Sequence, residues 1–456
     1  MSSNDMSFPW KEISPGNFRQ PLDSFGRIWS TFYHTDAKYG REPVCIASYV
    51  KFNTTLEAKD LETNLRDAWK ATRYFNPGIA CAVDEFYREY KIPSQDEVDS
   101  WMLETFKTQL SKTPEEIIKN HTRDFHPVLH FFPAKDGNTR HELVILSNHM
   151  FNDARGEFYF WNSFFELVTT PEAVTFGDES KYLPPARDDL LGLPPSPSVP
   201  SYGKAMSLIG SAFVPDPVRT PLRPSNEASD GGCIKRLALS ESQTTKLVDA
   251  CKLKGVSVTA AVKAAHILTL RGLQGASDGN YRDECFGFEM MDPRSAFKRS
   301  YNPSQSIGTD YHILMPTKFS LGDNKTFLDV AKDMTTSFRT IREDFNKDAE
   351  GLDALGYVML QALTTPPEDP IPPIFSSLGI VDDFMKSNYG GSIVGIEDIW
   401  VVVPVNSGTY NGLWVWTWRG QLHLLTSFNK GCYSTEMMEK ALQTIVDALL
   451  EGLNIE

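Results

Sequence analysis

Residues 143–156 read LVILSNHMFNDARG, an apolar run that turns into a polar loop and then into a helix rich in aromatic residues. The Leu-Val-Ile-Leu run is apolar at every position, which is typical of a strand covered on both faces. A loop that leaves such a strand is held rigidly and is a common place for catalytic groups. His149 lies in this loop, and Asp153 follows four residues later.

His149 can be interpreted in two ways. As a neutral imidazole it could take a proton from a hydroxyl that attacks a thioester, a step that a general base accelerates by about 10² to 10⁴. As a structural residue it would only be hydrogen-bonded, and Asp153 would cap the helix that follows. The spacing HxxxD recurs by accident, so the pattern by itself leaves both interpretations open.

Strands and helices are predicted on both sides of this stretch. Residues 44–52 predict a strand, and a helix with one apolar face follows it and stops before an Asn-Pro pair. Residues 127–132 and 143–147 predict a β-hairpin with its turn around Asp136-Gly137. The first part of the chain therefore has the pattern of an α/β unit.

The second half repeats the order of strand and then helix. Residues 234–239 alternate as in a strand, and Ser240 with Gln243 has the spacing of a capping box that opens a helix. Gly255 is well placed to end this helix, and Ser257 to start the next one. Near the end, a second predicted hairpin around Arg419-Gly420 precedes a last helix with a clean period of about 3.6 residues.

Between the two halves the composition changes. Prolines recur between positions 184 and 224, and they are expected to forbid long regular elements there. We therefore predict an N-terminal lobe over residues 1–172, a proline-rich crossover linker over 173–232 and a C-terminal lobe over 233–456.

Composition excludes several classes of protein. The net charge of −14 makes nucleic acid an unlikely main partner. Six cysteines without a CxxC pair argue against a structural zinc site and a disulfide framework, so we expect no metal. The N-terminus has no basic-then-apolar signal and no apolar run of about 18 residues occurs, which predicts a cytoplasmic protein without membrane insertion.

The common motifs of other enzyme classes are absent. The chain contains no GxGxxG, GxxxxGK, HExxH or GxSxG sequence. Dinucleotide enzymes, P-loop NTPases, zincins and ordinary α/β-hydrolases are therefore disfavoured, and the histidines become the main candidates for chemistry.

Several segments, in order, resemble one superfamily. Residues 143–156 resemble the HxxxD(G) active-site segment of the chloramphenicol acetyltransferase-like superfamily, which includes plant BAHD acyltransferases, peptide-synthetase condensation domains and fungal acetyltransferases of the trichothecene 15-O-acetyltransferase type. Residues 234–270 resemble the strand-helix-helix that opens the second lobe of these enzymes. MMDPRSAF, residues 290–297, resembles their arginine-bearing strand, and FSSLG, residues 375–379, resembles an SNLG-like segment. The last hairpin and helix are similar to the C-terminal ending of the family.

This resemblance implies an α/β fold of two similar lobes, a pseudo-dimer with the active-site channel between them and His149 in that channel. Asp153 would face away from the substrate and pair with Arg294. A buried pair of this sort fixes the loop, since removing one partner leaves a costly unpaired charge. The family also implies acetyl-CoA or another acyl-CoA as co-substrate, no permanently bound cofactor, a small hydroxylated acceptor and a site complete within a monomer.

Other site residues follow from the same resemblance. Ser376 and Ser377 could donate a hydrogen bond to the oxyanion of the intermediate or contact the pantetheine arm, although serines at such positions are mostly structural. The phosphates of coenzyme A would need basic partners. The candidates in the helix-loop-helix that touches this cofactor in relatives are Lys252, Lys254, Ser257 and Lys263. Each lysine by itself is better explained as a solvated surface charge, and the patch as a whole is a stronger candidate than any of its members.

The sequence departs from the family pattern at three places. Asn148 stands where condensation domains have their first histidine, which argues against amide formation of the peptide-synthetase kind. Ala154 replaces the glycine that often follows the aspartate. The BAHD motif DFGWG is absent, and NYGGS at residues 388–392 is no convincing substitute. The sequence is therefore nearer to the fungal acetyltransferases.

Three functions remain open at this point. The first is an acyl-CoA-dependent O-acyltransferase, here an O-acetyltransferase, that esterifies a bulky apolar secondary metabolite such as a terpenoid, polyketide or alkaloid alcohol. The second is a condensation-like enzyme that uses a carrier-protein thioester, or that forms amides or catalyses cyclisation. The third is a non-catalytic binding protein on the same scaffold.

Overall fold

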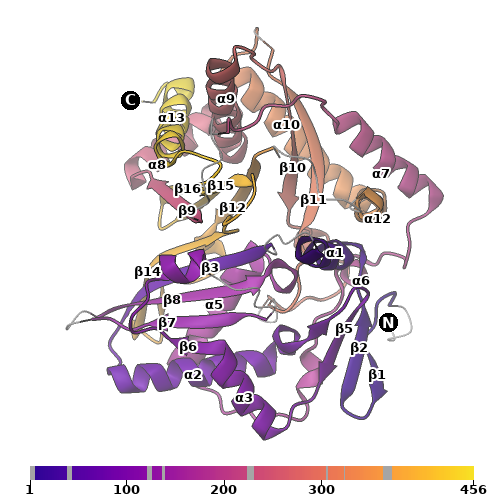
Figure 1. The fold of residues 1–456 in the computed structure, drawn as a ribbon, viewed down its shortest axis with the longest axis vertical. Helices are drawn as coiled ribbons and strands as arrows, with labels where there is room; N and C mark the ends of the chain where they lie inside the picture. The colour runs from indigo at the N-terminus through magenta and orange to yellow at the C-terminus, as the bar shows by residue number, and fades with distance from the viewer. Residues whose placement is uncertain are drawn as a thin grey trace. The chain divides into compact units, whose positions relative to one another are not determined.

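The computed structural model describes residues 6–38, 44–120, 126–135, 139–222, 231–303, 307–322, 324–362 and 372–455. The chain divides into two compact units, each of them discontinuous in sequence. The first unit comprises Met1–Ser196, Asp292–His312 and Val381–Val403, and the second comprises Pro197–Met291, Ile313–Ile380 and Pro404–Glu456. Both units combine helices with a six-stranded sheet, as expected for an α/β fold of two lobes (Figure 1).

The first unit contains a six-stranded sheet of order β13-β14-β3-β8-β7-β6 and a four-stranded sheet of order β1-β2-β5-β4. Its strands are β1 (Lys11–Ser14), β2 (Asn17–Pro21), β3 (Cys45–Thr54), β4 (Ala82–Val83), β5 (Tyr87–Lys91), β6 (Phe106–Thr108), β7 (Val128–Phe132), β8 (Arg140–Asn148), β13 (Asn388–Tyr389) and β14 (Val394–Val402). Its α-helices are α1 (Ser24–Lys38), α2 (Ala58–Phe75), α3 (Gln95–Thr105), α4 (Pro114–Lys119), α5 (Ala154–Thr169) and α6 (Arg187–Leu191). Short 3-10 helices are η2 (Pro77–Ala80), η3 (His149–Phe151), η4 (Glu179–Tyr182), η5 (Arg294–Ala296) and η7 (Val381–Asp383).

Strand β8 occupies an inner position of the larger sheet. It pairs antiparallel with β3 on one side and with β7 on the other. Every residue from Leu143 to Asn148 is buried, so the prediction of a covered strand is confirmed. The predicted hairpin of β7 and β8 is confirmed as well, while its expected turn at Asp136-Gly137 lies outside the described residues.

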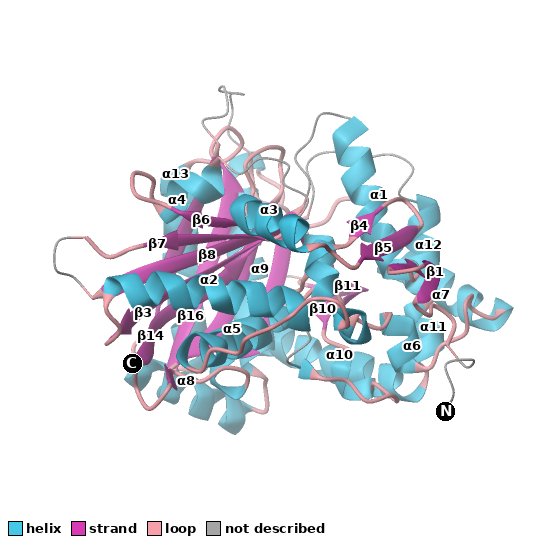
Figure 2. Cartoon of the chain, turned by 90° about the horizontal axis from the view of Figure 1, so that it is seen from below, coloured by secondary structure: helices cyan, strands magenta, loops and turns pink. Residues whose placement is uncertain are grey.

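Helices α2 and α5 run along one face of this sheet (Figure 2). The predicted helix before the Asn-Pro pair is confirmed as α2, which ends at Phe75. The side chains of Phe158, Trp161 and Phe165 on α5 are fully buried. Burial of these large rings supplies much of the driving force that fixes α5, and hence the loop at its N-terminus.

The second unit contains a six-stranded sheet of order β11-β10-β12-β15-β16-β9. Its strands are β9 (Gly232–Ala238), β10 (Glu284–Met291), β11 (Ile313–Ser320), β12 (Ile374–Ile380), β15 (Asn411–Trp418) and β16 (Gln421–Asn429). Its helices are α7 (Val199–Ala212), α8 (Glu241–Lys254), α9 (Val258–Asp278), α10 (Phe327–Lys347), α11 (Ala349–Asp353), α12 (Leu355–Ala362) and α13 (Thr435–Leu453).

Several local predictions for the second unit are confirmed. Ser240 and Gln243 form a capping box at the start of α8, and Gly255 ends that helix with a φ of +70°. Ser257 caps α9, whose apolar face packs into the core of the unit together with α10 and α13. Strands β15 and β16 form the predicted second hairpin.

The prediction that the proline-rich region contains no long regular element is wrong. It contains α7, a helix of 14 residues that starts at Val199 with Ser198 as its cap. Pro200 lies in the first turn, where its missing N–H has no partner to lose, and no proline follows until the helix has ended.

The two units also differ from the lobes expected from sequence. Residues 173–196 group with the first unit rather than with a linker. The segments Asp292–His312 and Val381–Val403, expected in the C-terminal lobe, group with the first unit as well. The second of them brings β14, which pairs antiparallel with β3 although it is far away in sequence.

Among the described residues, no single helix combines the length and hydropathy of a membrane span. Helices α8 and α9 reach those values only together, as a pair that is bent by 97°.

Candidate active site

His149 is the first residue after β8 and begins the short helix η3. Its backbone N–H donates to the carbonyl of Val44 at 2.9 Å. Its imidazole stacks on the indole of Trp29 from α1, with ring centroids 4.4 Å apart and planes 8° from parallel. The side chain is 10% exposed, so it is nearly buried but not fully enclosed.

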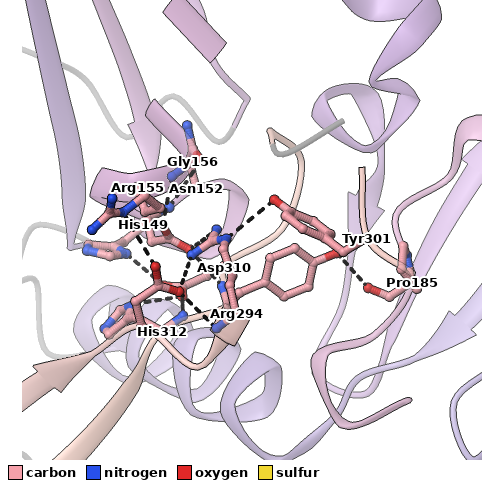
Figure 3. Close-up of polar contacts among 12 residues, drawn as sticks. His149, Asn152, Arg155, Gly156, Pro185, Arg294, Tyr301, Asp310 and His312 are labelled. Carbon is pink, nitrogen blue, oxygen red and sulfur yellow. Dashed lines mark hydrogen bonds and ion pairs between the residues drawn. The ribbon is translucent and has the colours of Figure 1, made fainter. Parts of the chain in front are cut away.

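A carboxylate also holds the imidazole, through the Nδ1 atom at the edge of the ring. The Nδ1 atom of His149 lies 3.0 Å from Oδ2 of Asp310, whose side chain is 2% exposed. The same carboxylate contacts a second histidine, because Nδ1 of His312 lies 2.6 Å from Oδ1 of Asp310. Asp310 therefore lies between two imidazoles, as Figure 3 shows.

This arrangement selects one tautomer of His149. An ionised carboxylate only accepts hydrogen bonds, so Nδ1 must carry the proton and Nε2 of the neutral ring has the lone pair. Nε2 of His149 makes no hydrogen bond to any residue within the described ranges. The ring is thus oriented through one nitrogen and has the other available as a base.

The charges around Asp310 are strongly coupled. Burial by itself would raise the pKa of Asp310, but the charge of His312 and the hydrogen bonds from both histidines outweigh it and hold the pKa below its usual value. Burial alone would lower the pKa of His312, yet the charge of Asp310 and their hydrogen bond raise it. The two groups therefore favour each other's charged forms, an ionised Asp310 and a protonated His312.

Asp153 serves as a structural anchor four residues after His149. It is the N-cap of α5, since its Oδ1 accepts from the N–H of Gly156 at 2.8 Å. Its Oδ2 accepts from Nη2 of Arg294 at 2.8 Å and from the N–H of Tyr311 at 2.9 Å. One carboxylate thus ties together the start of α5, the turn η5 and the segment that contains Asp310.

Arg294 has the position that the resemblance implied, but it lies in η5, just after β10, rather than in the strand. Its guanidinium also donates to Asp292 at 3.0 Å and lies near the rings of Tyr301 and Tyr311. Burial would lower the pKa of Arg294, but the charges of Asp153 and Asp292 raise it well above its ordinary value. Burial would raise the pKa of Asp153, and the charge of Arg294 reverses this and lowers it.

The segment that carries Asp310 is fixed by close backbone contacts. Gly308 has a φ of +116°, and a Cβ there would lie 2.8 Å from Cα of Gly78. Its N–H donates to the carbonyl of Phe151 at 2.7 Å, and its carbonyl accepts from Arg88 at 3.1 Å. These contacts join the Asp310 segment to η3, so the carboxylate and His149 keep their register.

The serines expected near the thioester lie in the second unit, on β12. Ser376 is 9% exposed, and in the sheet it lies opposite Trp414 of the parallel strand β15. The hydroxyl of Ser377 lies 2.9 Å from that of Thr259 on α9. Ser377 is therefore a neighbour of the start of α9. The start of α9 follows Lys252, Lys254 and Ser257 closely in sequence.

Three of the expected cofactor residues lie around the connection between α8 and α9. Lys252 is exposed, Lys254 is partly exposed, and neither has a hydrogen-bond or ion-pair partner within the described part of the chain. Ser257 is exposed but caps α9 through the N–H of Ala260 at 3.2 Å.

The prediction for Lys263 is contradicted. This side chain is 4% exposed, and its ammonium contacts the carboxylate of Glu289 beside the rings of Phe319 and Phe375. Burial lowers the pKa of Lys263 to about 8. A lysine that faces the core of the unit cannot be part of an exposed basic patch, so it is removed from the set of phosphate contacts.

His149, Asp310 and His312 are the one set of described side chains whose nitrogen and oxygen ligand atoms cluster as at a metal site, within 4.8 Å of one another. Both Nδ1 atoms already have the carboxylate as their hydrogen-bond partner. The cluster is therefore fully explained by hydrogen bonding.

Comparison with known proteins gives consistent results. No family model matches the chain. In sequence it is similar to the O-acetyltransferase pigM of Monascus ruber, with 27% identity over 98% of this chain and 88% of the relative. It is also similar to the acetyltransferase pigO of the same fungus, with 22% identity over 98% of both chains.

The solved structures agree with these sequence matches. The TRI3 trichothecene 15-O-acetyltransferase from Fusarium sporotrichioides aligns with a TM-score of 0.78 and 17% identity over 99% of this chain and 98% of that one. The first condensation domain of the CDA synthetase aligns with a TM-score of 0.66 and 13% identity over 95% and 96% of the two chains. At these identities the structures establish a shared fold.

Proposed function

We propose that this chain, an acyltransferase of the chloramphenicol acetyltransferase-like superfamily, transfers an acyl group from acyl-CoA to a hydroxyl with His149 as general base. One observation carries the proposal: His149 is held through Nδ1 by Asp310 and has a second nitrogen that no described residue occupies. A general base needs this combination of a fixed ring and an available lone pair.

The proposed reaction proceeds in two steps. Nε2 of His149 takes the proton of the acceptor hydroxyl while the hydroxyl oxygen attacks the carbonyl carbon of the thioester. This attack forms a C–O bond and a tetrahedral oxyanion. The adduct then collapses, the C–S bond breaks, and the imidazolium returns its proton to the leaving thiolate. The products are an ester and free coenzyme A, and no covalent acyl-enzyme is formed.

Asp153 and Arg294 are structural residues in this proposal. Both oxygens of Asp153 have partners in the loop and in η5, so neither is left to move a proton. The pair keeps His149 and Asp310 in register, as a rigid support for a catalytic group must.

We propose acetyl-CoA as the donor, because the relatives that match nearly the whole chain are named acetyltransferases. Lys252, Lys254 and Ser257 are our candidates for contacts to the donor, and Ser376 and Ser377 for the oxyanion or the pantetheine arm. The acceptor would be a bulky apolar secondary metabolite with a hydroxyl. We further propose that the chain acts as a cytoplasmic monomer.

The proposal is tested with acetyl-CoA labelled in the acetyl group. The purified chain is incubated with a panel of hydroxylated terpenoids, polyketides and alkaloids, and products are identified by mass spectrometry. We expect a labelled ester that forms with the wild type and with His34→Gln, an exposed histidine variant, but not with His149→Gln. Turnover of a carrier-bound acyl group in place of acetyl-CoA would favour a condensation-like enzyme, and acceptor binding without any transfer would favour a binding protein.

A further inference from the structure

We propose that His312 is a positioning residue that balances the charge of Asp310. The carboxylate can then orient His149 without favouring the protonated form of its imidazole. The inference rests on the proposed role of His149 as a base. It assigns a function to a second histidine that has no place in the HxxxD pattern.

The two histidines do not share Asp310 equally. Oδ1 of Asp310 accepts hydrogen bonds from the backbone N–H of His312 at 2.8 Å and from Nδ1 of the same residue at 2.6 Å. Oδ2 accepts from His149 at the longer distance of 3.0 Å. A shorter hydrogen bond to a carboxylate is the stronger one, and it favours a cationic donor. The geometry therefore places the proton-rich imidazole at His312.

The reason for a second histidine is electrostatic. A buried carboxylate beside a lone imidazole favours the imidazolium, and a protonated His149 could not accept a proton from an alcohol. With a protonated His312 on its other oxygen, the charge of Asp310 is already compensated. The hydrogen bond to Nδ1 of His149 is retained, and the drive to protonate its Nε2 is reduced. The raised pKa of His312 agrees with this assignment.

The other charged groups near the cluster are largely paired among themselves. Arg294 pairs with Asp153 and Asp292, and Arg187 pairs with Asp188 at 2.6 Å. Arg88 donates to the carbonyls of Gly308 and Met150, and Asp23 accepts from the N–H groups of Gly26 and Arg187. Of these, Asp153 raises and Arg187 lowers the pKa of His312, and both contribute less than Asp310 does. His312 is therefore the main compensating charge for Asp310.

The geometry predicts how each variant changes the ionisation of His149. His312→Gln retains an amide donor toward Asp310 but removes the positive charge, so the pKa of His149 should rise. Asp310→Asn removes the negative charge, so the pKa of His149 should fall. A shift of one unit corresponds to a tenfold change in the protonation equilibrium, and we expect about one unit or more in each direction.

The direct test is an NMR pH titration of the full chain with isotope-labelled histidine, assigned through the His149→Gln and His312→Gln variants. In the wild type, His312 should stay protonated to higher pH than His149. Exposed His34→Gln serves as control and should leave both titrations unchanged. A wild-type His149 that titrates above His312, or one whose titration is the same in His312→Gln and Asp310→Asn, would overturn the inference.

Enzyme kinetics separate this inference from the proposed function. If acyl transfer is found, the acid limb of kcat/KM should move to higher pH in His312→Gln, with a rate near that of the wild type on the alkaline plateau. A uniform loss at every pH would mean that His312 is only structural and would overturn the inference. If no acyl transfer is found but the NMR shifts occur, the proposed function fails while the charge balance stands.

Discussion

Asp153 uses both of its carboxylate oxygens to hold the loop of His149, and only one of its partners is charged. Arg294→Met would leave this carboxylate buried with no cation beside it. We expect the variant to lose about 3–5 kcal/mol of stability, and the double variant Asp153→Asn/Arg294→Met to recover part of that loss. Urea unfolding of Arg294→Met, Asp153→Asn and the double variant measures this coupling, and an Arg294→Met variant within about 1 kcal/mol of the wild type would contradict it.

Glu157 predicts a dependence of stability on pH. It lies on α5 and is 0% exposed. Its polar neighbours Asn152 and Ser48 do not reach hydrogen-bonding geometry, so both of its oxygens lack a partner among the described residues. Burial raises the pKa of Glu157 to about 8. The folded state therefore holds a proton that the unfolded state, with a pKa of roughly 4.3, has lost. Stability should fall as the pH rises from the unfolded pKa to about 8, and change no further above it.

Glu157→Gln should remove this part of the slope and be more stable than the wild type at neutral pH. Thermal unfolding from pH 5 to pH 8 measures the effect, with Glu166→Gln on the solvent side of α5 as the matched control. Equal slopes for Glu157→Gln and the wild type would show that this carboxyl is ionised in the folded protein.

Only some of the candidate site could be predicted at the scale of single residues. His149 and Asp153 stand in one short loop after a recognisable strand, and Arg294 follows from the resemblance. Asp310 and His312 were missed, because they lie about 160 residues from His149 and Asp-x-His carries no distinctive spacing. The signal that could have revealed them is the pair of polar side chains two residues apart just before strand β11, since such residues lie on the same side of an extended chain.

At the scale of elements, the segment from Ile307 to His312 is the most sensitive connection of the site. Gly308→Ala would force a Cβ against the backbone of Gly78 and impose a strained φ of +116°. We expect lower stability together with slower acyl transfer, because a shift of this segment moves Asp310 away from His149. Gly272→Ala is the control: its Cβ would meet open space on α9, so stability should rise by about 0.5–1 kcal/mol. A Gly308→Ala variant with wild-type activity would contradict the account.

Local signals predicted many elements correctly, and their failures have physical causes. The capping box at Ser240 and the positive φ at Gly255 depend on neighbours within a few residues, so the sequence alone predicts them. Lys263 was misplaced because its partner Glu289 lies on another element, 26 residues away. Its position among the apolar residues of the first turns of α9 was the available signal, since a lysine is fully buried only when it is paired.

At the scale of the whole molecule, pairing between distant segments limited the prediction. Strand β14 joins the sheet of the first unit, although it was expected in the C-terminal lobe. No strand was predicted over Val394–Val402, and nothing in this stretch specifies β3 as its neighbour. Sequence patterns therefore predicted the class and part of the elements, and long-range pairing set the actual composition of the two units.

Direct transfer predicts a kinetic property of the whole enzyme. Without a covalent acyl-enzyme, both substrates must be bound before the thioester is broken. Labelled coenzyme A should therefore not exchange into acetyl-CoA when the acceptor is absent. Exchange at a rate comparable to turnover would indicate a ping-pong mechanism and an acyl-enzyme.

The most direct test of the central claim is the pH dependence of ester formation by the wild type and by His149→Gln, with circular dichroism to verify that both are folded. The variant should be slower than the wild type by a factor of about 10² to 10⁴, and its residual rate should lack the acid limb of the wild type. A folded His149→Gln variant with the rate and pH profile of the wild type would show that this imidazole is not the base.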